Sequence, residues 1–200
     1  FAGNTDDYYD PRNSFLNEVL DRKLGIPITL SILYLEIGRR LGLELEGVPF
    51  PGHFLVKYPT EEGDLVLDPY AGGMPLDEND LQTLLDRTYS APDNAPPLGQ
   101  LLVSAGKKDI LVRMLRNLKG VYQHNDQPAK MLNVLNRILL IAPDLTPELL
   151  ERARLHDQLE CQRAALDDYQ RYLALEPNNS AALEIGRRVA ELRLLVARLN

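Results

Sequence analysis

The sequence predicts an α+β fold in its first half and an all-α fold in its second half. In the first half, two apolar, β-prone runs flank a polar turn that contains glycine, which is the signal of a β-hairpin. From Lys107 onward the apolar residues follow a helical period almost throughout. The charge balance also changes: residues 1–100 contain 17 Asp and Glu against 7 Lys and Arg, whereas residues 101–200 contain 12 against 15. Such a shift supports two modules.

Length and composition limit the possible functions. The chain has 200 residues, 44% of them hydrophobic, which is ample for a core, and no apolar run approaches the length of a membrane span. The net charge of −7 argues against non-specific binding to nucleic acid. The single cysteine, Cys161, excludes an internal disulfide and fits a reducing cytoplasm, where we expect the protein to be located. Because the chain begins at Phe1 rather than Met, we expect an N-terminal part to be missing.

Two helices are expected before the hairpin. Asp10 and Pro11 predict an N-cap and a first helical residue, so the first helix should run through residues 13–23. The second helix starts near Pro27 and ends at Gly42, which can adopt the left-handed conformation. Its apolar residues form two stripes, so we expect it to be the central helix, covered on more than one side. The stripes are Leu30, Leu33, Ile37 and Leu41, and Ile28, Ile32 and Leu35.

The predicted hairpin brings two titratable residues together. His53 opens the first strand and Asp68 closes the second, so antiparallel pairing places both at the same end of the hairpin. A carboxylate in this position can orient an imidazole, as in hydrolase triads. Taken singly, His53 fits a hydrogen-bonded turn residue and Asp68 fits a turn former. Taken together, they predict a contact between His53 and Asp68.

A short helix and a linker should complete the first module. Residues 71–75 predict a glycine-rich turn, and residues 77–88 predict a helix with its leucines facing inward. Residues 90–99 contain three prolines and predict a loop. We therefore expect the first domain to cover residues 1–95 and a linker to cover residues 96–106.

The remaining region, residues 107–200, has the period of a repeat array. Pro143 and Pro177 each follow an apolar helix end, and they lie 34 residues apart, which is the tetratricopeptide period. We predict two degenerate repeats, at Leu111–Ala142 and Thr146–Glu176, followed by one capping helix. Breaks in the helical pattern are expected at residues 125–127, 142–147 and 176–179. Such arrays present concave surfaces, so we expect a protein or peptide partner.

Four short motifs in the first half resemble one family. They are Asp10-Pro11-Arg12-Asn13-Ser14, Gly25-Ile26-Pro27-Ile28-Thr29, Pro51-Gly52-His53-Phe54-Leu55 and Asp68-Pro69-Tyr70-Ala71-Gly72-Gly73. In this order they look like the transglutaminase-like domain of the bacterial SirB family, which commonly carries tetratricopeptide repeats after the domain. The resemblance implies a papain-like transglutaminase fold. It also implies a catalytic Cys at the start of the central helix, with His53 and Asp68 behind it.

The expected nucleophile is absent from this sequence. The Cys should fall within residues 27–31, but no Cys is there, and Cys161 matches no nucleophile position of the family. Thr29 and Ser31 are the only hydroxyl residues in that window, and a hydroxyl is the weaker nucleophile at neutral pH. In the first turn of a helix they would serve equally well as caps or as donors to backbone carbonyls, and we favour that structural role.

Four neighbouring residues are expected to line the cleft: Asn13, Pro27, Gly52 and Gly72. Helix capping explains Asn13 equally well, and turn formation explains the glycines. The sequence shows no zinc-ligand spacing, no calcium loop and no phosphate-binding glycine motif, so we expect neither a metal nor a cofactor.

The leading hypothesis is a pseudoenzyme, a non-catalytic transglutaminase-like protein that binds a protein or peptide through its cleft and its repeats. The alternative is an acyl-transfer hydrolase, related to amidases or proteases, that uses Thr29 or Ser31 with His53 and Asp68. A third hypothesis is a purely structural repeat protein, in which His53 contributes only to stability. We expect partners to be proteins, not nucleic acid or membrane.

Overall fold

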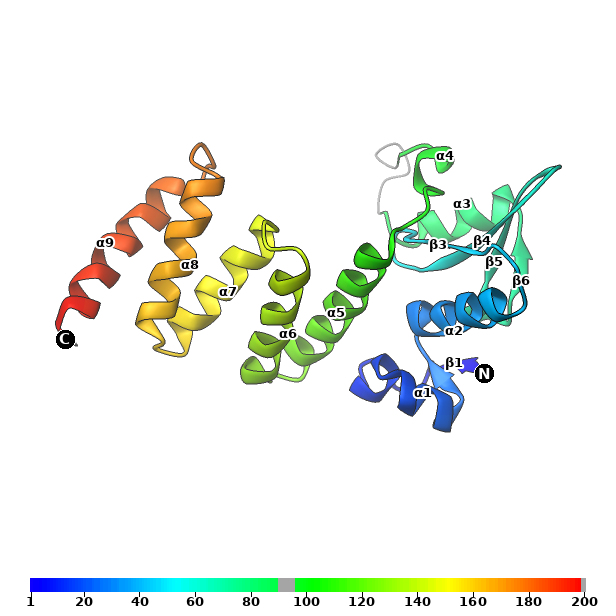
Figure 1. The fold of residues 1–200 in the computed structure, drawn as a ribbon, viewed down its shortest axis with the longest axis horizontal. Helices are drawn as coiled ribbons and strands as arrows, with labels where there is room; N and C mark the ends of the chain where they lie inside the picture. The colour runs from blue at the N-terminus through cyan, green and yellow to red at the C-terminus, as the bar shows by residue number, and fades with distance from the viewer. Residues whose placement is uncertain (90–95, 199–200) are drawn as a thin grey trace. The chain divides into compact units, whose positions relative to one another are not determined.

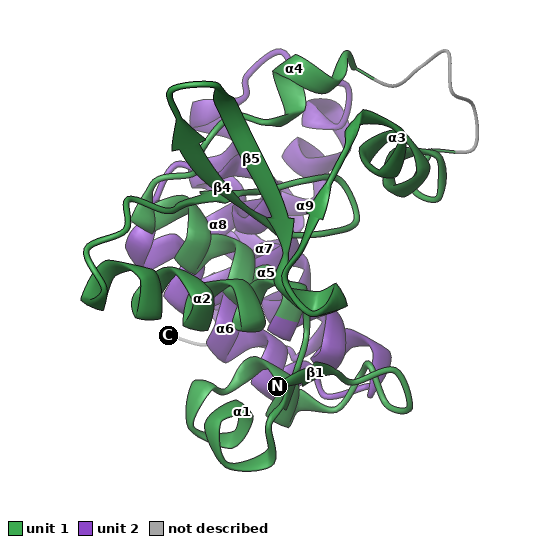
Figure 2. Cartoon of the chain, turned by 90° about the vertical axis from the view of Figure 1, so that its right-hand side faces the viewer, with its two compact units in different colours: residues 1–117 green, residues 118–200 purple. Residues whose placement is uncertain are grey.

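The chain folds into two compact units, Phe1–Asn117 and Leu118–Asn200, which Figure 2 distinguishes by colour. The computed structural model describes residues 1–89 and 96–198. The boundary predicted at residue 95 therefore lies outside the described residues. Figure 1 gives the order of the helices and strands along the chain, and each unit is described by itself below.

The first predicted helix is divided in two. Asp10 caps the 3₁₀ helix η1 (Pro11–Ser14), because its carboxylate accepts the Arg12 backbone N–H at 2.9 Å. Phe15 then adopts an extended conformation, and the α-helix α1 (Leu16–Arg22) begins only after it. Among the apolar side chains of α1, Val19 is fully buried but Leu20 is 45% exposed.

The central helix, α2 (Pro27–Arg40), begins where the sequence predicted, and Gly42 follows it in the left-handed conformation with φ of 76°. Its first turn is buried on all sides, from Pro27 to Ser31. Farther along, the apolar side chains are more exposed: Ile37 is 53% exposed and Leu41, just after the helix, is 71% exposed. The prediction that the stripe from Leu30 to Leu41 is buried was therefore wrong for its C-terminal half, because no described element covers that face.

The predicted hairpin forms the middle of a four-stranded antiparallel sheet with the order β3-β4-β5-β6. The strands are β3 (Glu46–Val48), β4 (Leu55–Thr60), β5 (Gly63–Asp68) and β6 (Met74–Leu76). Strand β6 lies where we predicted only a turn, and it pairs Asp68 with Met74. A separate two-stranded parallel pair joins β1 (Ala2–Gly3) to β2 (Leu24–Gly25).

The predicted linker belongs to the core of the N-terminal unit. Helix α3 (Glu78–Asp86) packs Leu81 and Leu85 against the sheet, as predicted. Helix α4 (Leu98–Leu101) lies inside the predicted linker, and its leucines pack against the same cluster. The next helix, α5 (Lys107–His124), starts at the predicted residue but contributes its first part to the N-terminal unit, which extends to Asn117. Burial of these apolar side chains moves the boundary past residue 106.

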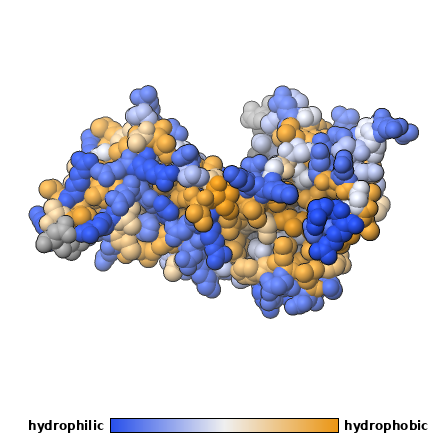
Figure 3. All heavy atoms as spheres, in the orientation of Figure 1, coloured by the Kyte–Doolittle hydropathy of each residue, from blue (hydrophilic) through white to orange (hydrophobic). Residues whose placement is uncertain are grey.

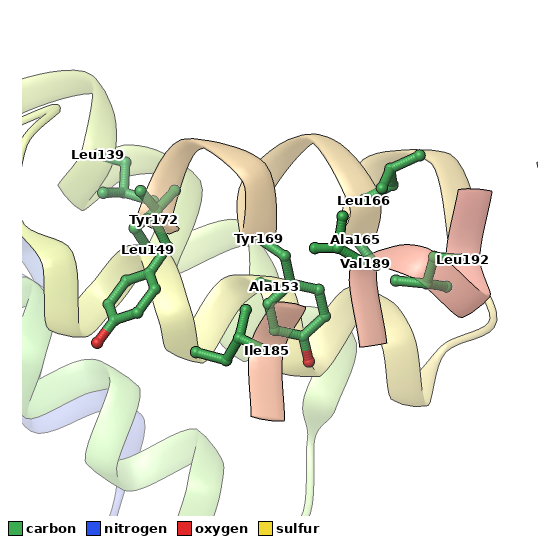
Figure 4. Packing of buried hydrophobic residues seen from close by; sticks show 10 residues of the cluster. All are labelled: Leu139, Leu149, Ala153, Ala165, Leu166, Tyr169, Tyr172, Ile185, Val189 and Leu192. Atoms are coloured by element: carbon green, nitrogen blue, oxygen red, sulfur yellow. The ribbon is translucent and has the colours of Figure 1, made fainter. Parts of the chain in front are cut away.

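The C-terminal unit contains the end of α5 and four further helices. These are α6 (Pro128–Ile141), α7 (Thr146–Gln158), α8 (Gln162–Leu175) and α9 (Ala182–Arg198). Side chains of α7, α8 and α9 point toward one another in Figure 4, where Ala153, Tyr169 and Ile185 lie in one buried cluster. The small Ala153 and Ala165, both fully buried, allow these helices to approach closely.

The 34-residue period is visible in the backbone of the turns. Asp126 and Glu160, 34 residues apart, both have positive φ, 50° and 58°. The Gln127 N–H donates to the Tyr122 carbonyl at 2.9 Å, and the Cys161 N–H donates to His156 at 2.8 Å. Our set of expected breaks missed the turn between α7 and α8, because neither glycine nor proline marks it. The repeat spacing was the signal that could have located it.

A buried polar cluster joins α7 to α8. Arg152 donates two hydrogen bonds to the Asp168 carboxylate, at 2.6 and 2.7 Å. His156 Nε2 lies 4.0 Å from the same carboxylate, and its Nδ1 is buried without a hydrogen-bond partner among the described residues. Burial lowers the pKa of His156, Asp168 raises it and Arg152 lowers it further.

The turn before β4 generates a stability prediction. Gly52 has φ of 65°, and a Cβ there would lie 2.4 Å from Thr88 Oγ1. Gly72 has φ of 84° but open space around it, so it is a matched control. We expect Gly52→Ala to lower the free energy of unfolding by about 2–4 kcal/mol and Gly72→Ala by about 1–2 kcal/mol, measured by urea denaturation. Equal losses would show that Thr88 does not constrain Gly52, as would a failure of Thr88→Ala to rescue Gly52→Ala.

The second prediction concerns pH. Because the folded-state pKa of His156 lies below its ordinary value of 6.5, the unfolded chain binds more protons than the folded one as the pH falls through that value. The free energy of unfolding should therefore decrease on acidification from about pH 7.5 to about pH 5.5. His156→Tyr introduces the residue found 34 positions earlier, Tyr122, and should flatten this dependence. The exposed His124, changed to Gln, is the control, and an unchanged slope in His156→Tyr would refute the assignment.

Candidate functional site

The structure brings His53 and Asp68 together at one end of the hairpin. Their Nε2 and Oδ1 atoms are 2.9 Å apart, and the two side chains are only 12% and 5% exposed. Antiparallel pairing of Val56 with Leu67 sets this register, because His53 precedes β4 and Asp68 ends β5. The Nε2 atom is nevertheless misaligned for a hydrogen bond, so the contact is one of ion-pair distance.

Tyr70 holds the Asp68 side of the pair. Its backbone N–H donates to Asp68 Oδ1 at 2.9 Å, which caps the 3₁₀ helix η2 (Pro69–Ala71). Its ring meets the His53 ring edge-on, with centroids 5.7 Å apart. Burial raises the pKa of Tyr70, and the neighbouring Asp68 charge raises it further. The pair is therefore fixed from both the strand and the following turn.

The space beside His53 is small and has no nucleophile on its helix wall. The start of α2 contributes Pro27 and Ile28 to this cavity, whose volume is about 20 Å³. That is room for about one water molecule. The other lining residues are Tyr8, Gly52, His53, Phe54, Arg113 and Asn117.

Thr29 and Ser31 are both fully buried and bonded to the backbone. Thr29 Oγ1 accepts the Ile26 N–H at 3.0 Å and donates to the Asn13 carbonyl at 2.9 Å. Ser31 Oγ donates to the Phe54 carbonyl at 3.0 Å. Neither residue lines the His53 cavity. These contacts are those of structural hydroxyl groups.

Two of the four residues expected to line the cleft do so, and two do not. Pro27 and Gly52 line the cavity. Asn13 lies elsewhere and is fully buried: its amide nitrogen donates to the Asp7 carbonyl at 2.8 Å, and its amide oxygen accepts from Asn4 at 3.0 Å. Its side chain therefore holds the N-terminal loop by hydrogen bonds. Gly72 is exposed in the turn after η2.

Five residues of the cavity were not predicted as site residues: the apolar Ile28 and Phe54, and the polar Tyr8, Arg113 and Asn117. Arg113 donates to the carbonyls of Phe50 and His53, both at 3.4 Å, and burial lowers its pKa. Asn117 follows one helical turn later on the same face of α5, and Tyr8 reaches the cavity from the N-terminal loop. Burial also raises the pKa of Tyr8. Arg113 and Asn117 lie on α5, whose helical period predicted a place in the repeats, so no sequence signal placed them at this site.

Within residues 1–89 and 96–198, no three His, Cys, Asp or Glu side chains gather as metal ligands would. None of the described helices is both long and apolar enough to cross a membrane.

Comparison with known proteins identifies both parts of the chain. The sequence profile of the transglutaminase-like superfamily matches residues 1–116, and a tetratricopeptide-repeat profile matches residues 118–190. The two matches divide at nearly the same place as the two compact units. These profiles agree with the resemblance drawn from the four motifs.

Individual relatives give the same result. A UPF0162 protein of Xylella fastidiosa is 44% identical over 180 residues, which are 89% of this chain and 64% of that protein. Protein SirB1 of Salmonella typhimurium is 27% identical over 169 residues, 82% of this chain and 61% of that protein. This chain thus spans less than two thirds of the length of these relatives. Among solved structures, the first TPR of Spaghetti bound to an HSP90 peptide covers 45% of this chain and 77% of that chain, at 20% identity and a TM-score of 0.36. The chain belongs to the transglutaminase-like superfamily and carries a tetratricopeptide-repeat region after its transglutaminase-like domain.

Proposed function

We propose that this protein is a non-catalytic transglutaminase-like protein, a pseudoenzyme, that binds a protein or peptide. One observation carries the proposal: the start of α2 presents Pro27 and Ile28 to His53, and neither side chain can act as a nucleophile. Acyl transfer through a covalent intermediate needs a nucleophile within hydrogen-bond reach of its base. The only cysteine, Cys161, is exposed beside α8 in the other unit.

The size of the His53 cavity also supports a non-catalytic role. A substrate acyl group needs space beside the base, whereas the cavity has a volume of about 20 Å³. Tyr8 and Arg113 also line this cavity. On this proposal the His53–Asp68 pair is kept as part of the packing between the hairpin, η2 and α5.

The repeat region supplies the binding part of the proposal. Two hollows of about 610 and 300 Å³ lie in the C-terminal unit, and both are lined by Arg154 and Gln158 of α7. Amide and charged side chains of this kind suit the polar backbone of a peptide. Arg154 and Arg187 have no ion-pair partner among the described residues, so both remain available to a ligand. A single cysteine and bacterial relatives support a bacterial, cytoplasmic protein.

An acyl-transfer hydrolase remains the second candidate, because the His53–Asp68 pair provides a base and its orienting carboxylate. Thr29 or Ser31 would then be the nucleophile. Each hydroxyl would first have to leave its backbone carbonyl, at Asn13 or Phe54. The two proposals differ in whether either hydroxyl reacts.

A covalent probe separates the two candidates. We expect a fluorophosphonate probe to leave Thr29 and Ser31 unlabelled in the folded protein, as measured by intact-mass spectrometry and peptide mapping, because neither hydroxyl reaches His53. Iodoacetamide should label Cys161 alone, and Cys161→Ser should abolish that signal, which controls for probe access. Stoichiometric labelling of Thr29 or Ser31 that disappears in His53→Ala would establish the hydrolase instead.

The binding part has its own prediction. We expect peptides selected from a phage-displayed random library by the wild-type protein to lose at least about tenfold in affinity when Arg154 and Arg187 are changed to Glu. The loss follows from replacing two unpaired cations at the hollow with anions. Arg137→Glu, an exposed change on α6 outside both hollows, is the control. Equal affinity for all three proteins in fluorescence anisotropy would exclude this surface.

A further inference from the structure

The N-terminal unit has a hollow much larger than the His53 cavity, an apolar groove farther along α2. Its volume is about 870 Å³, against about 20 Å³ beside His53. We call it the α2–α5 groove. Its apolar lining comes from Ile32, Leu35, Leu43, Leu45, Ile110 and Met114. Sites of this size and character are typical of binding. Figure 3 shows that hydrophobic residues, in orange, reach the visible surface of both units.

The floor of the groove is a packed core, so the hollow is preformed. Ile32, Ile110 and Met114 pack on a cluster of fully buried side chains, which are Ile26, Ile28 and Phe54. Gly47 allows the close approach of this floor, since a Cβ there would lie 3.0 Å from Phe54 and 3.2 Å from Ile110. At the rim, Leu43 is 41% exposed and Leu111 is 48% exposed. A partner could bury these two side chains without unfolding the unit.

The net charge of the N-terminal unit favours a cationic occupant of the groove. Glu36 is paired with Arg39 at 2.8 Å, and Glu46 is paired with Lys57 at 3.2 Å. Glu44 and Lys107 have no ion-pair partner within the described residues. Of these residues, all but Lys57 line the groove, which gives three acidic and two basic residues in its lining. The unit as a whole is strongly acidic, because residues 1–117 contain 18 Asp and Glu against 11 Lys and Arg, a net charge of −7.

The neighbouring strand edge favours a helix over an extended peptide. An extended peptide gains affinity by adding to a free strand edge, and β3 is the edge strand beside the groove. The Gly47 carbonyl of β3 already accepts the Ala105 N–H at 2.8 Å. A helix satisfies its own backbone hydrogen bonds and needs only an apolar surface for its apolar stripe.

We propose that the α2–α5 groove binds an amphipathic helix of a partner protein, with an apolar stripe flanked by Lys or Arg. The leucine side chains of the stripe fill the groove, and the cations face Glu44 and the acidic surface around it. A second copy of this chain fits less well, because it brings the same negative unit. A fatty acid fits less well, because its carboxylate would enter a unit whose net charge is −7. The groove lies in a different unit from the repeat hollows, so this proposal can succeed or fail independently of them.

The test uses a fluorescent helical peptide of leucine and lysine, about 18 residues or five turns long, with leucine spaced at i, i+3, i+4 and i+7. Fluorescence anisotropy with the whole chain should give saturable 1:1 binding. The affinity should be at least about tenfold higher than for the corresponding leucine–glutamate peptide and for a shuffled leucine–lysine peptide.

Variants at the exposed rim locate the binding site. Leu43→Arg and Leu111→Arg should each lower the affinity for the leucine–lysine peptide by at least about tenfold, because each removes apolar contact and adds charge repulsion. Glu44→Gln should lower this affinity by a few-fold and make it less dependent on salt concentration. The matched control is Leu41→Arg, since Leu41 is 71% exposed and does not line the groove. Circular dichroism and the urea midpoint confirm that each variant is folded.

Four results would overturn the proposal. One is an equal loss of affinity in Leu41→Arg, which would mean that the cationic peptide is attracted to the acidic protein in general. Another is equal or tighter binding of the leucine–glutamate peptide. A third is a dimer, seen by light scattering, that Leu111→Arg dissociates, which would assign the groove to a second copy. The fourth is saturable binding of laurate together with no peptide binding, which would make the groove a small-molecule site.

Discussion

Two buried hydroxyl groups hold the start of α2 in place, and the rest of the N-terminal unit depends on that position. Thr29 donates to the Asn13 carbonyl of η1, and Ser31 donates to the Phe54 carbonyl just before β4. These bonds join the helix to the N-terminal loop and to the hairpin. Removing either hydroxyl would leave a buried carbonyl without its donor, which costs about 1–3 kcal/mol. The residues at the nucleophile position thus serve the fold.

The same helix has two surfaces with different chemistry. At its start, Pro27 and Ile28 close the space beside His53. Farther along, Ile32 and Leu35 form one wall of the α2–α5 groove. Helix α5 follows the same division, with Arg113 at the cavity and Ile110 at the groove. Ile28 and Phe54, which line the cavity, belong to the same buried cluster on which the groove residues Ile32, Ile110 and Met114 pack.

In the C-terminal unit, the two repeats resemble each other more in the backbone geometry of their turns than in their side chains. The two turns at Asp126 and Glu160 share their left-handed residue and their hydrogen bonds, although Tyr122 in one repeat corresponds to His156 in the other. For a residue other than glycine, the left-handed conformation costs about 1–2 kcal/mol of stability. Packing of α7 and α8 over the buried Ala153 and Ala165 offsets that cost. Burial lowers the pKa of that histidine, which has no counterpart in the other repeat.

The sequence by itself determined the central helix, the hairpin, the 34-residue period and the placement of His53 opposite Asp68. These follow from local patterns: alternation in strands, helical spacing and the antiparallel register of one turn. Only the tertiary structure decided that Arg113 belongs to the His53 cavity, that Ile37 is left exposed and that the linker joins the core. Those outcomes depend on contacts between segments some 60 residues apart, such as Arg113 with His53, and the periodicity of a helix states which face is apolar but not which neighbour covers it.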